Sequence, residues 1–320
     1  MQANFHAEGQ VGSDEIHEDL EKVFKVSEYL DFPFTLEEVA NYFLPETQLT
    51  GEQLRSILST RSFADIPFRI KDGYLLTGAS QANNSRLERE QMSVAKLESA
   101  AGFASVLKRM VPFIRTVAVT GSVAYGSANK WDDIDLFIVT KRNRLWLTAF
   151  MTLVFVRLTK LLGLRAPHLS LFCLSYVHDE QGFANESQKN RKNPLFAREL
   201  LKAKPVAGAD HYRKILEGSS WVQDIYSMSY AAKLRGLKIE VEGEGLEVER
   251  DGSPFSFSLK WAECIAFVFL SRYLRIRAYL TNLKLRSQGE DFHVFEPKLS
   301  AVSCVYTSNF YEWLSGLWGE

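Results

Sequence analysis

Two aspartates, Asp133 and Asp135, stand one residue apart where an apolar, β-branched run begins. In a β-strand their side chains point to one face, while Ile134 and Leu136 point to the other face and into a core. Two carboxylates held about 6–7 Å apart on a rigid strand repel each other. A divalent cation between them removes that cost, and ligands that are all oxygen favour Mg2+ or Mn2+ over zinc. The pair therefore predicts a magnesium or manganese site.

A second motif of small residues, Gly121-Ser122, ends the preceding apolar run ten residues before Asp133. Glycine lets the backbone approach a phosphate, which backbone N–H groups and a helix N-terminus stabilise, and the Ser122 hydroxyl can donate one more hydrogen bond. The alternatives are a tight turn that needs only small residues and an acid, such as Asp132, that simply caps a turn. Together, with a strand on either side, the two motifs favour a site for a metal-bound phosphate.

Helices and strands must position these residues, and their predicted order gives an α/β (α+β) core over residues 84–180. Its predicted elements are a helix over 84–109, a strand over 116–120, a strand over 134–140, a helix over 141–162 and a strand over 168–177. The second half, 190–320, is predicted as a helical C-terminal domain. Its helices are expected over 194–203, 209–217, 220–234 and 259–285, with an acidic β insert near 237–257.

The N-terminal part is predicted to be a flexible tail over 1–13 and a winged-helix-like domain over 14–80. Apolar spacing indicates a helix that ends near Leu30, and the pairs Thr35/Glu38 and Thr50/Gln53 have the spacing of capping boxes that start two more helices. Two short apolar runs joined by Lys71-Asp72-Gly73 then predict a hairpin. Three helices followed by a hairpin is the order of a winged helix-turn-helix.

The charge of that N-terminal part argues against binding to duplex DNA. Residues 1–60 hold 12 acids and three bases, a balance of −9, although the whole chain carries only −1. Phosphates would repel such a segment, and the helix that would enter the major groove offers only Arg55. A scaffold or protein-contact role is the favoured interpretation.

Cysteine use and hydropathy predict a cytoplasmic protein with no membrane contact. Cys173, Cys264 and Cys304 lie far apart in apolar runs, which favours buried thiols in a reducing compartment. No secretory signal is visible at the N-terminus. The longest apolar runs, over 145–156 and 264–271, are shorter than the roughly 20 residues of a spanning helix and are interpreted as buried core helices.

The order V-T-G-S, ten residues and D-I-D-L resembles the signature of the nucleotidyltransferase-fold superfamily, over residues 117–176. The whole layout more loosely resembles bacterial nucleotidyltransferase-domain proteins without an assigned substrate, through GSVA, the R-L-W-L helix start at 144–147 and Phe292-His293. The resemblance implies that Gly121 and Ser122 contact a nucleoside triphosphate, with ATP expected, and that the two aspartates hold magnesium. It further implies metal-dependent transfer of a nucleoside monophosphate to a hydroxyl of an unknown acceptor.

The sequence departs from that family in two respects. Many members place a third carboxylate on a later strand, but the run over 168–177 has no acid. Asp179 and Glu180, just beyond it, could reach back or could be ordinary loop acids.

A base often follows the Gly-Ser motif in that superfamily, and here Tyr125 stands in its place. The nearest bases that could bind phosphates are Lys130, Lys141 and Arg144, although a solvated helix start explains the last two equally well. These departures leave an alternative open, in which a catalytically degenerate module binds nucleotide or a partner without turnover.

Overall fold

The computed structural model describes residues 13–45, 47, 49–60, 68–71, 73–77, 82–161, 172–237, 254–289 and 294–318. The chain forms two compact units. Unit 1 is Met1–Leu87 with Trp221–Ala232, and unit 2 is Glu88–Ser220 with Lys233–Glu320. Residues 1–12 of the predicted tail lie outside the described residues, as do Asp72, Phe292 and His293.

Unit 1 has the predicted order of three helices and a hairpin. Its first part consists of α1 (Ser13–Leu30), β1 (Phe34–Thr35), α2 (Leu36–Tyr42), α3 (Gly51–Thr60), β2 (Phe68–Lys71) and β3 (Tyr74–Thr77). The strands form an antiparallel sheet in the order β1-β3-β2. The later segment holds α10 (Trp221–Ile225) and the start of α11 (Ser227–Gly236). The winged-helix classification itself stays a prediction.

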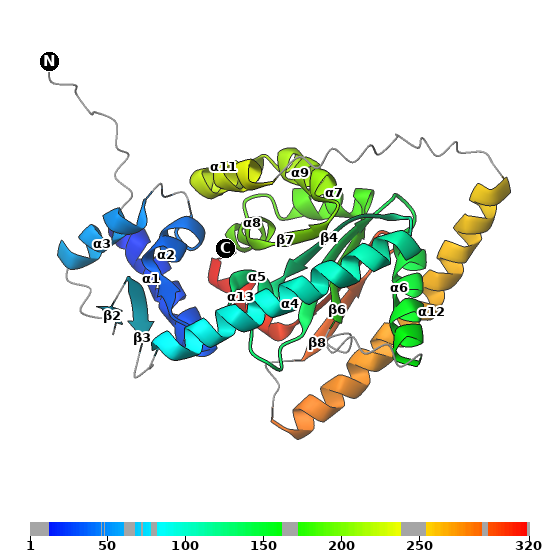
Figure 1. Cartoon of the computed structure of the whole chain (residues 1–320), viewed down its shortest axis with the longest axis horizontal. Helices are drawn as coiled ribbons and strands as arrows, with labels where there is room; N and C mark the ends of the chain where they lie inside the picture. Colours follow the sequence, from blue (N-terminus) through cyan, green and yellow to red (C-terminus); the bar gives the residue numbers. More distant parts are fainter. Residues whose placement is uncertain are drawn as a thin grey trace, which may run out of the picture. The chain divides into compact units, whose positions relative to one another are not determined.

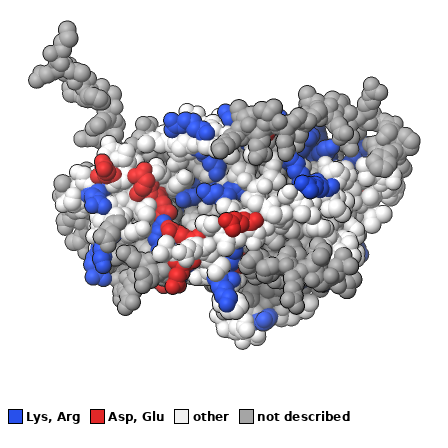
Figure 2. Space-filling view, viewed as in Figure 1, with Lys and Arg blue, Asp and Glu red and all other residues white. Residues whose placement is uncertain are grey.

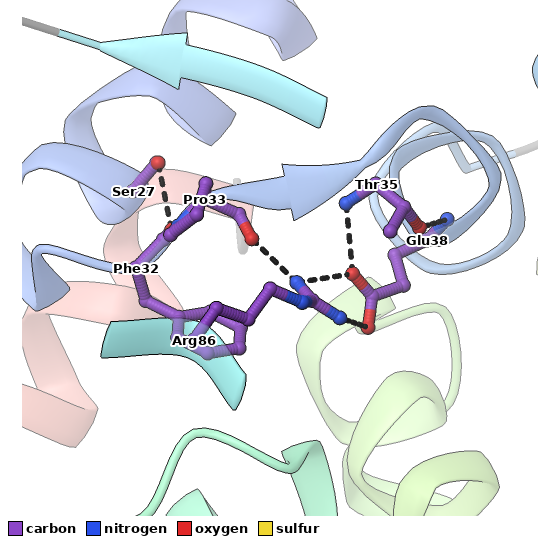
Figure 3. Close-up of polar contacts among 6 residues, drawn as sticks. All are labelled: Ser27, Phe32, Pro33, Thr35, Glu38 and Arg86. Atoms are coloured by element: carbon purple, nitrogen blue, oxygen red, sulfur yellow. Dashed lines mark hydrogen bonds and ion pairs between the residues drawn. The ribbon is translucent and has the colours of Figure 1, made fainter. Parts of the chain in front are cut away.

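A buried ion pair joins the first turn of α2 to the start of α4 (Ala82–Met110) (Figure 3). Glu38 completes the predicted capping box by accepting from the Thr35 N–H at 2.8 Å. Its two carboxylate oxygens also accept from the Arg86 guanidinium, at 3.0 and 3.1 Å. Arg86 donates further to the Pro33 carbonyl at 2.5 Å and stacks over the Phe32 ring. Every oxygen of this carboxylate therefore has a donor from the protein.

Acidic side chains gather on the surface of unit 1, where α1 to α3 lie (Figure 2). Lys22, one of the three bases within residues 1–60, is already paired with Glu18 at 3.0 Å and Asp19 at 3.2 Å. A duplex would therefore meet mostly negative charge on this unit, and weak binding to duplex DNA stays a prediction.

Unit 2 is built on one six-stranded mixed sheet in the order β7-β4-β5-β6-β9-β8 (Figure 1). The strands are β4 (Ile114–Thr120), β5 (Ile134–Thr140), β6 (Phe172–Asp179), β7 (Lys204–Ala207), β8 (Phe295–Leu299) and β9 (Ser303–Ser308). The helices besides α4 are α5 (Gly121–Tyr125), α6 (Leu145–Leu161), α7 (Glu180–Lys189), α8 (Pro194–Lys202), α9 (Ala209–Gly218), α12 (Pro254–Ser287) and α13 (Asn309–Trp318). Strands β5 and β6 are parallel, and β4 and β5 are antiparallel.

Alternation along β5 gives the sheet two covered faces. Leu136 and Ile138 join a core cluster with residues of α4, α6 and α12. Phe137 points to the other face, where its ring contacts those of Phe183 in α7 and Tyr212 in α9. Burial on both sides explains why this strand reads as an almost continuous apolar run.

The second half of the chain differs from the expected helical domain, because it supplies β7, β8 and β9 to the same sheet as the core strands. These strands are only four to six residues long, so each gives a short periodic signal even where, as in β8, exposed and half-buried positions alternate. The predicted helix over 220–234 is two helices, α10 and α11. Most of the predicted insert, 238–253, lies outside the described residues, and 254–257 begin α12.

The cysteines and the apolar helices also differ from expectation. Cys304 is buried, Cys173 is half-buried and Cys264 is exposed, so the prediction of three buried thiols is wrong for Cys264. The run over 264–271 is not a fully buried core helix either, because Ile265 and Phe269 are exposed. Within the residues that the structure describes, no helix is long and apolar enough to cross a bilayer.

Candidate active site

The Gly-Ser and Asp-x-Asp motifs meet where β4 ends and β5 begins. Thr120 lies opposite Asp135 in the antiparallel ladder, so the turn at Gly121 is placed beside the Asp135 side chain. Gly121 has a φ of +64°, which favours glycine, and a Cβ there would collide with the Asp135 carboxylate. Glycine is therefore required here by backbone conformation and by the approach of the acid.

The residues after Gly121 form α5, a helix of five residues that ends at Gly126 in the left-handed conformation. The Ser122 carbonyl accepts from the Ser127 N–H at 2.9 Å, which closes the turn. A helix this short carries only a small dipole, so the dipole contribution expected from the sequence is small. Backbone N–H groups and the half-buried Ser122 can still face an anion.

The two aspartates and Cys173 bring their candidate ligand atoms within 4.8 Å of one another. Asp133 is exposed, while Asp135 and Cys173 are half-buried. The spacing is that of a cation site, and two carboxylates are sufficient for magnesium or manganese, which keep waters and phosphate oxygens in their shells. Cys173 was not among the predicted site residues, since its sequence context indicated only a buried thiol.

Burial and mutual repulsion dominate the electrostatics of the two carboxylates. Burial and the neighbouring charge of Asp133 raise the pKa of Asp135 to about 7, and Ser175 offsets this in part by donating a hydrogen bond to its Oδ1. Burial, with the charge of Asp132, also raises the pKa of Asp133. A bound divalent cation would reverse both effects.

Burial and the charges of both aspartates raise the pKa of the Cys173 thiol to about 12. The thiol therefore stays protonated and donates to Asp133. A neutral thiol is a poor ligand, and the donor set remains oxygen in character, which suits a hard cation.

Lys96 on α4 holds the loop that leads into Asp133. Its side chain is fully buried, and its ammonium donates to the carbonyls of Asn129 at 2.6 Å and Asp132 at 2.5 Å. Burial lowers its pKa, while the charges of Asp132 and Asp133 act the other way. Sequence reasoning missed Lys96, although it stands one helical turn before the buried Ala100.

One carboxylate from outside the Asp-x-Asp motif, that of Glu199, lies near the site. Glu199 on α8 accepts from the Tyr125 hydroxyl at 2.7 Å, and Tyr125 is the last residue of α5. The negative charge of Glu199 helps to raise the pKa of Asp135. Burial raises the pKa of Glu199 itself. Glu199 lies on a helix, whereas a third acid was expected from the sequence on or just after the strand over 168–177. No pattern in the sequence points to it.

The structure places the two candidate third acids at the opposite end of the strands. Asp179 lies opposite Thr140, the last residue of β5, whereas Asp135 lies opposite Cys173. Both Asp179 oxygens are occupied as helix and loop caps, by the N–H groups of Gly182 at 2.7 Å and Asn143 at 2.8 Å. Glu180 follows Asp179 and pairs with Arg115, near the start of β4, at 3.0 Å. Because of this register neither Asp179 nor Glu180 lies beside Asp135, and the structure favours the alternative that they are not part of the site.

Two of the three expected phosphate-binding bases lie at that same far end. Lys141 and Arg144 follow the last residue of β5, about 20 Å along the strand from Asp135. Arg144 is buried and stacks over the Phe113 ring. Lys130 lies in the exposed loop before β5, with its ammonium over the Trp131 ring at 5.3 Å. Lys130 alone of the three is near the candidate site.

Three lysines that the sequence did not single out gather around β7, the strand next to β4, instead. Lys204 on β7 pairs in register with Val119, two residues before Gly121. Lys202 lies over the Tyr125 ring at 5.4 Å. Burial, together with the charges of Lys204 and Lys202, lowers the pKa of Lys233 to about 7. Crowded ammonium groups of this kind indicate a place that favours an anion.

A glycine turn packed on an Asp-x-Asp strand of a mixed sheet is the arrangement expected of an enzyme that transfers phosphate-linked groups with a metal. Residues 101–204, about a third of the chain, match the family model of the nucleotidyltransferase domain. The match contains both motifs and supports the nucleotidyltransferase-fold superfamily and nucleotidyl transfer in general. No curated protein and no solved structure showed a significant match.

Proposed function

We propose that the protein transfers a nucleoside monophosphate from a nucleoside triphosphate, with ATP as the expected donor, to a hydroxyl of an acceptor whose identity is open. The observation that carries the proposal is the close packing of Asp135 on Gly121, next to Asp133, within residues that match a nucleotidyltransferase domain. When bound, Mg2+ or Mn2+ would neutralise charge on the reacting phosphate and lower the pKa of the attacking hydroxyl.

The chain's own residues would bind and orient the nucleotide. Asp133 and Asp135 would hold the cation, and the backbone at Gly121-Ser122 would approach the phosphates closely. Lys202, Lys204 and Lys233 would balance the charge of the pyrophosphate that leaves when the hydroxyl oxygen bonds to the α-phosphorus. The hydroxyl proton would pass to water, since β6 offers no carboxylate beside Asp135.

The test is single-turnover incubation with each α-labelled nucleoside triphosphate and Mg2+ or Mn2+, followed by pyrophosphate release and label on protein or added hydroxyl compounds. Wild type should release pyrophosphate and the Asp133→Asn/Asp135→Asn variant should not. Transfer that is unchanged in the double variant would contradict the site.

The lysines allow a matched pair of variants. Lys204→Gln should weaken triphosphate binding about tenfold, because one charge beside the phosphates is lost. Lys141→Gln removes an equal charge from the far end of β5 and should leave binding unchanged. Equal weakening by both variants would remove the lysine cluster from the proposal.

A binding module without turnover is the second candidate, and one observation favours it. Strand β6 carries Cys173 opposite Asp135 and Ser175 hydrogen-bonded to it, where a third carboxylate would be expected. That candidate predicts triphosphate and metal binding by wild type, with no labelled product from any nucleotide.

A further inference from the structure

The long helix α12 has an exposed face that is apolar along most of its length. Ala266, Leu270 and Ala278 are buried against the rest of unit 2. On the opposite side six apolar residues are between 44% and 66% exposed: Ile265, Val268, Phe269, Ile276, Tyr279 and Leu280. Their spacing places them in one stripe of about 22 Å. An exposed apolar stripe of this length, on the side of the helix that faces away from the core, indicates a binding surface.

The stripe continues onto α6, which packs beside α12 (Figure 1). Phe150, Val154 and Leu158 of α6 are exposed at intervals of one helical turn. The rings of Phe150 and Phe269 meet at a centroid distance of 6.3 Å, so the two exposed faces adjoin. We refer to these nine residues as the α6–α12 face.

The charges around the α6–α12 face are almost all positive. Residues 145–161 and 254–287 contain eight bases and a single acid, Glu263. Glu263 is engaged elsewhere, because its carboxylate accepts from the N–H groups of Trp146 and Leu147 at the start of α6. Arg272 falls within the stripe and Arg275 lies beside it, and both are exposed.

From this combination we infer that the α6–α12 face binds an anionic lipid surface, with α12 lying in the plane of the interface. An amphipathic helix with aromatic and aliphatic residues on one face, flanked by arginines, inserts its apolar side chains at the headgroup boundary while the bases meet lipid phosphates. No span is implied, because no described helix is both long enough and apolar enough to cross a bilayer.

A second copy of the chain fits the same face less well. Two copies that met through their α12 stripes would bring Arg272 and Arg275 toward the same arginines of the other copy, and like charges across an interface oppose association. An anionic bilayer supplies the opposite charge over the whole face. This inference differs from the expectation of no membrane contact drawn from the sequence, and the experiment below decides between the two.

The experiment is sedimentation of the full chain with vesicles of phosphatidylglycerol and phosphatidylcholine in equal parts, and with vesicles of phosphatidylcholine alone. Wild type should bind the anionic vesicles and bind the neutral ones much more weakly. Ile265→Gln/Phe269→Gln should lower the partition coefficient about a hundredfold, and Arg272→Gln/Arg275→Gln about tenfold or more. The matched control is Val106→Gln/Met110→Gln, which changes two exposed apolar residues of α4 and should bind like wild type.

Several outcomes would overturn the inference. No binding of wild type to anionic vesicles, or equal loss in the α4 control, would do so. A dimer seen by analytical ultracentrifugation that Ile265→Gln/Phe269→Gln dissociates, with no vesicle binding by wild type, would assign the face to a second copy. Equal binding to neutral and anionic vesicles would remove the role of the arginines.

Discussion

Two carboxylates in this chain, Glu38 in unit 1 and Asp135 in unit 2, differ in the donors and charges that surround them. Glu38 receives the Arg86 guanidinium on both oxygens and a backbone N–H on one of them. Asp135 receives one hydroxyl, from Ser175, and otherwise faces burial and the charge of Asp133, which raise its pKa to about 7. The protein therefore supplies donors to both oxygens of Glu38, whereas Asp135 keeps capacity for the cation proposed above.

The number of protein donors around an acid separates structural acids from candidate functional ones. An acid whose oxygens are all matched by protein donors stabilises the fold and has no affinity left for a metal. An acid that is half-buried beside a like charge costs stability unless a ligand arrives, which is the physical signature of a binding site. Asp179, the last residue of β6, is a structural acid like Glu38, because two backbone N–H groups donate to its carboxylate.

The largest effect is expected from removing Asp135. Asp135→Ala should lower single-turnover nucleotidyl transfer about a thousandfold or more, because a metal ligand that acts on developing charge is lost. Glu38→Gln is the matched control in a partnered acid and should leave transfer by the folded protein unchanged. Transfer that survives Asp135→Ala, measured by pyrophosphate release, would place the reaction elsewhere.

The next effect tests the partnered acid. Arg86→Met should destabilise unit 1 by about 3 kcal/mol, because Glu38 would be left without its cation in a site where its side chain is only 19% exposed. Native-state hydrogen exchange of the α1–α3 amides measures the loss. Lys25→Met, a change to an exposed base, should leave the exchange as in wild type. Unchanged protection in Arg86→Met would show that the pair contributes little.

The pH dependence of the metal-free protein sharpens the contrast. Unfolded Asp135 ionises near 3.8, but folded Asp135 keeps its proton up to about pH 7. Stability is therefore unaffected below pH 4 and falls as the pH rises from about 4 to 7, while Asp135→Asn escapes the loss. The Tm advantage of the variant, measured with a chelator present, should grow by about 5 °C between pH 4 and pH 8. Glu38→Gln should show no such gain.

The smallest effect concerns Ser175. Its hydroxyl lowers the pKa of Asp135 by donating to the charged form. Ser175→Ala should shift the pH at which Mn2+ binds upward by about one unit, since a hydrogen bond to a charged group is lost. The measurement is Mn2+ titration by calorimetry or paramagnetic relaxation across pH 5 to about 9. A binding profile identical to wild type would show that Ser175 does not influence the metal site.

The sequence is enough to bring the central residues of the candidate site together, because these residues are local. Gly121, Ser122, Asp133 and Asp135 lie within one β-turn-loop-β segment, and strand periodicity alone puts the two acids on one face. The strand over 134–140 coincides with β5 for the same reason, since a strand buried on both faces gives a continuous apolar signal.

What surrounds that centre depends on tertiary placement and was not predictable. Lys96, Glu199 and Lys204 reach the site from α4, α8 and β7, over distances in sequence that no periodicity encodes. The sequence could not decide between the two interpretations of Lys141 and of Asp179, because proximity to a motif in sequence says nothing about which end of a strand a residue occupies. Strand β9 was missed because a six-residue segment next to a helix gives little alternation.

The pairing of β6 with β9 has a consequence for synthesis of the chain. Strand β6, which carries Cys173 and Ser175, lies between β5 and β9, and more than a hundred residues separate it from β9 along the chain. At ribosomal elongation rates the nascent protein must wait on the order of ten seconds for that partner. During this interval β6 is an unprotected sheet edge, open to pairing with other chains. Truncation before residue 303 would make that transient edge permanent, so the candidate site should be recoverable in soluble form only from proteins that keep β9.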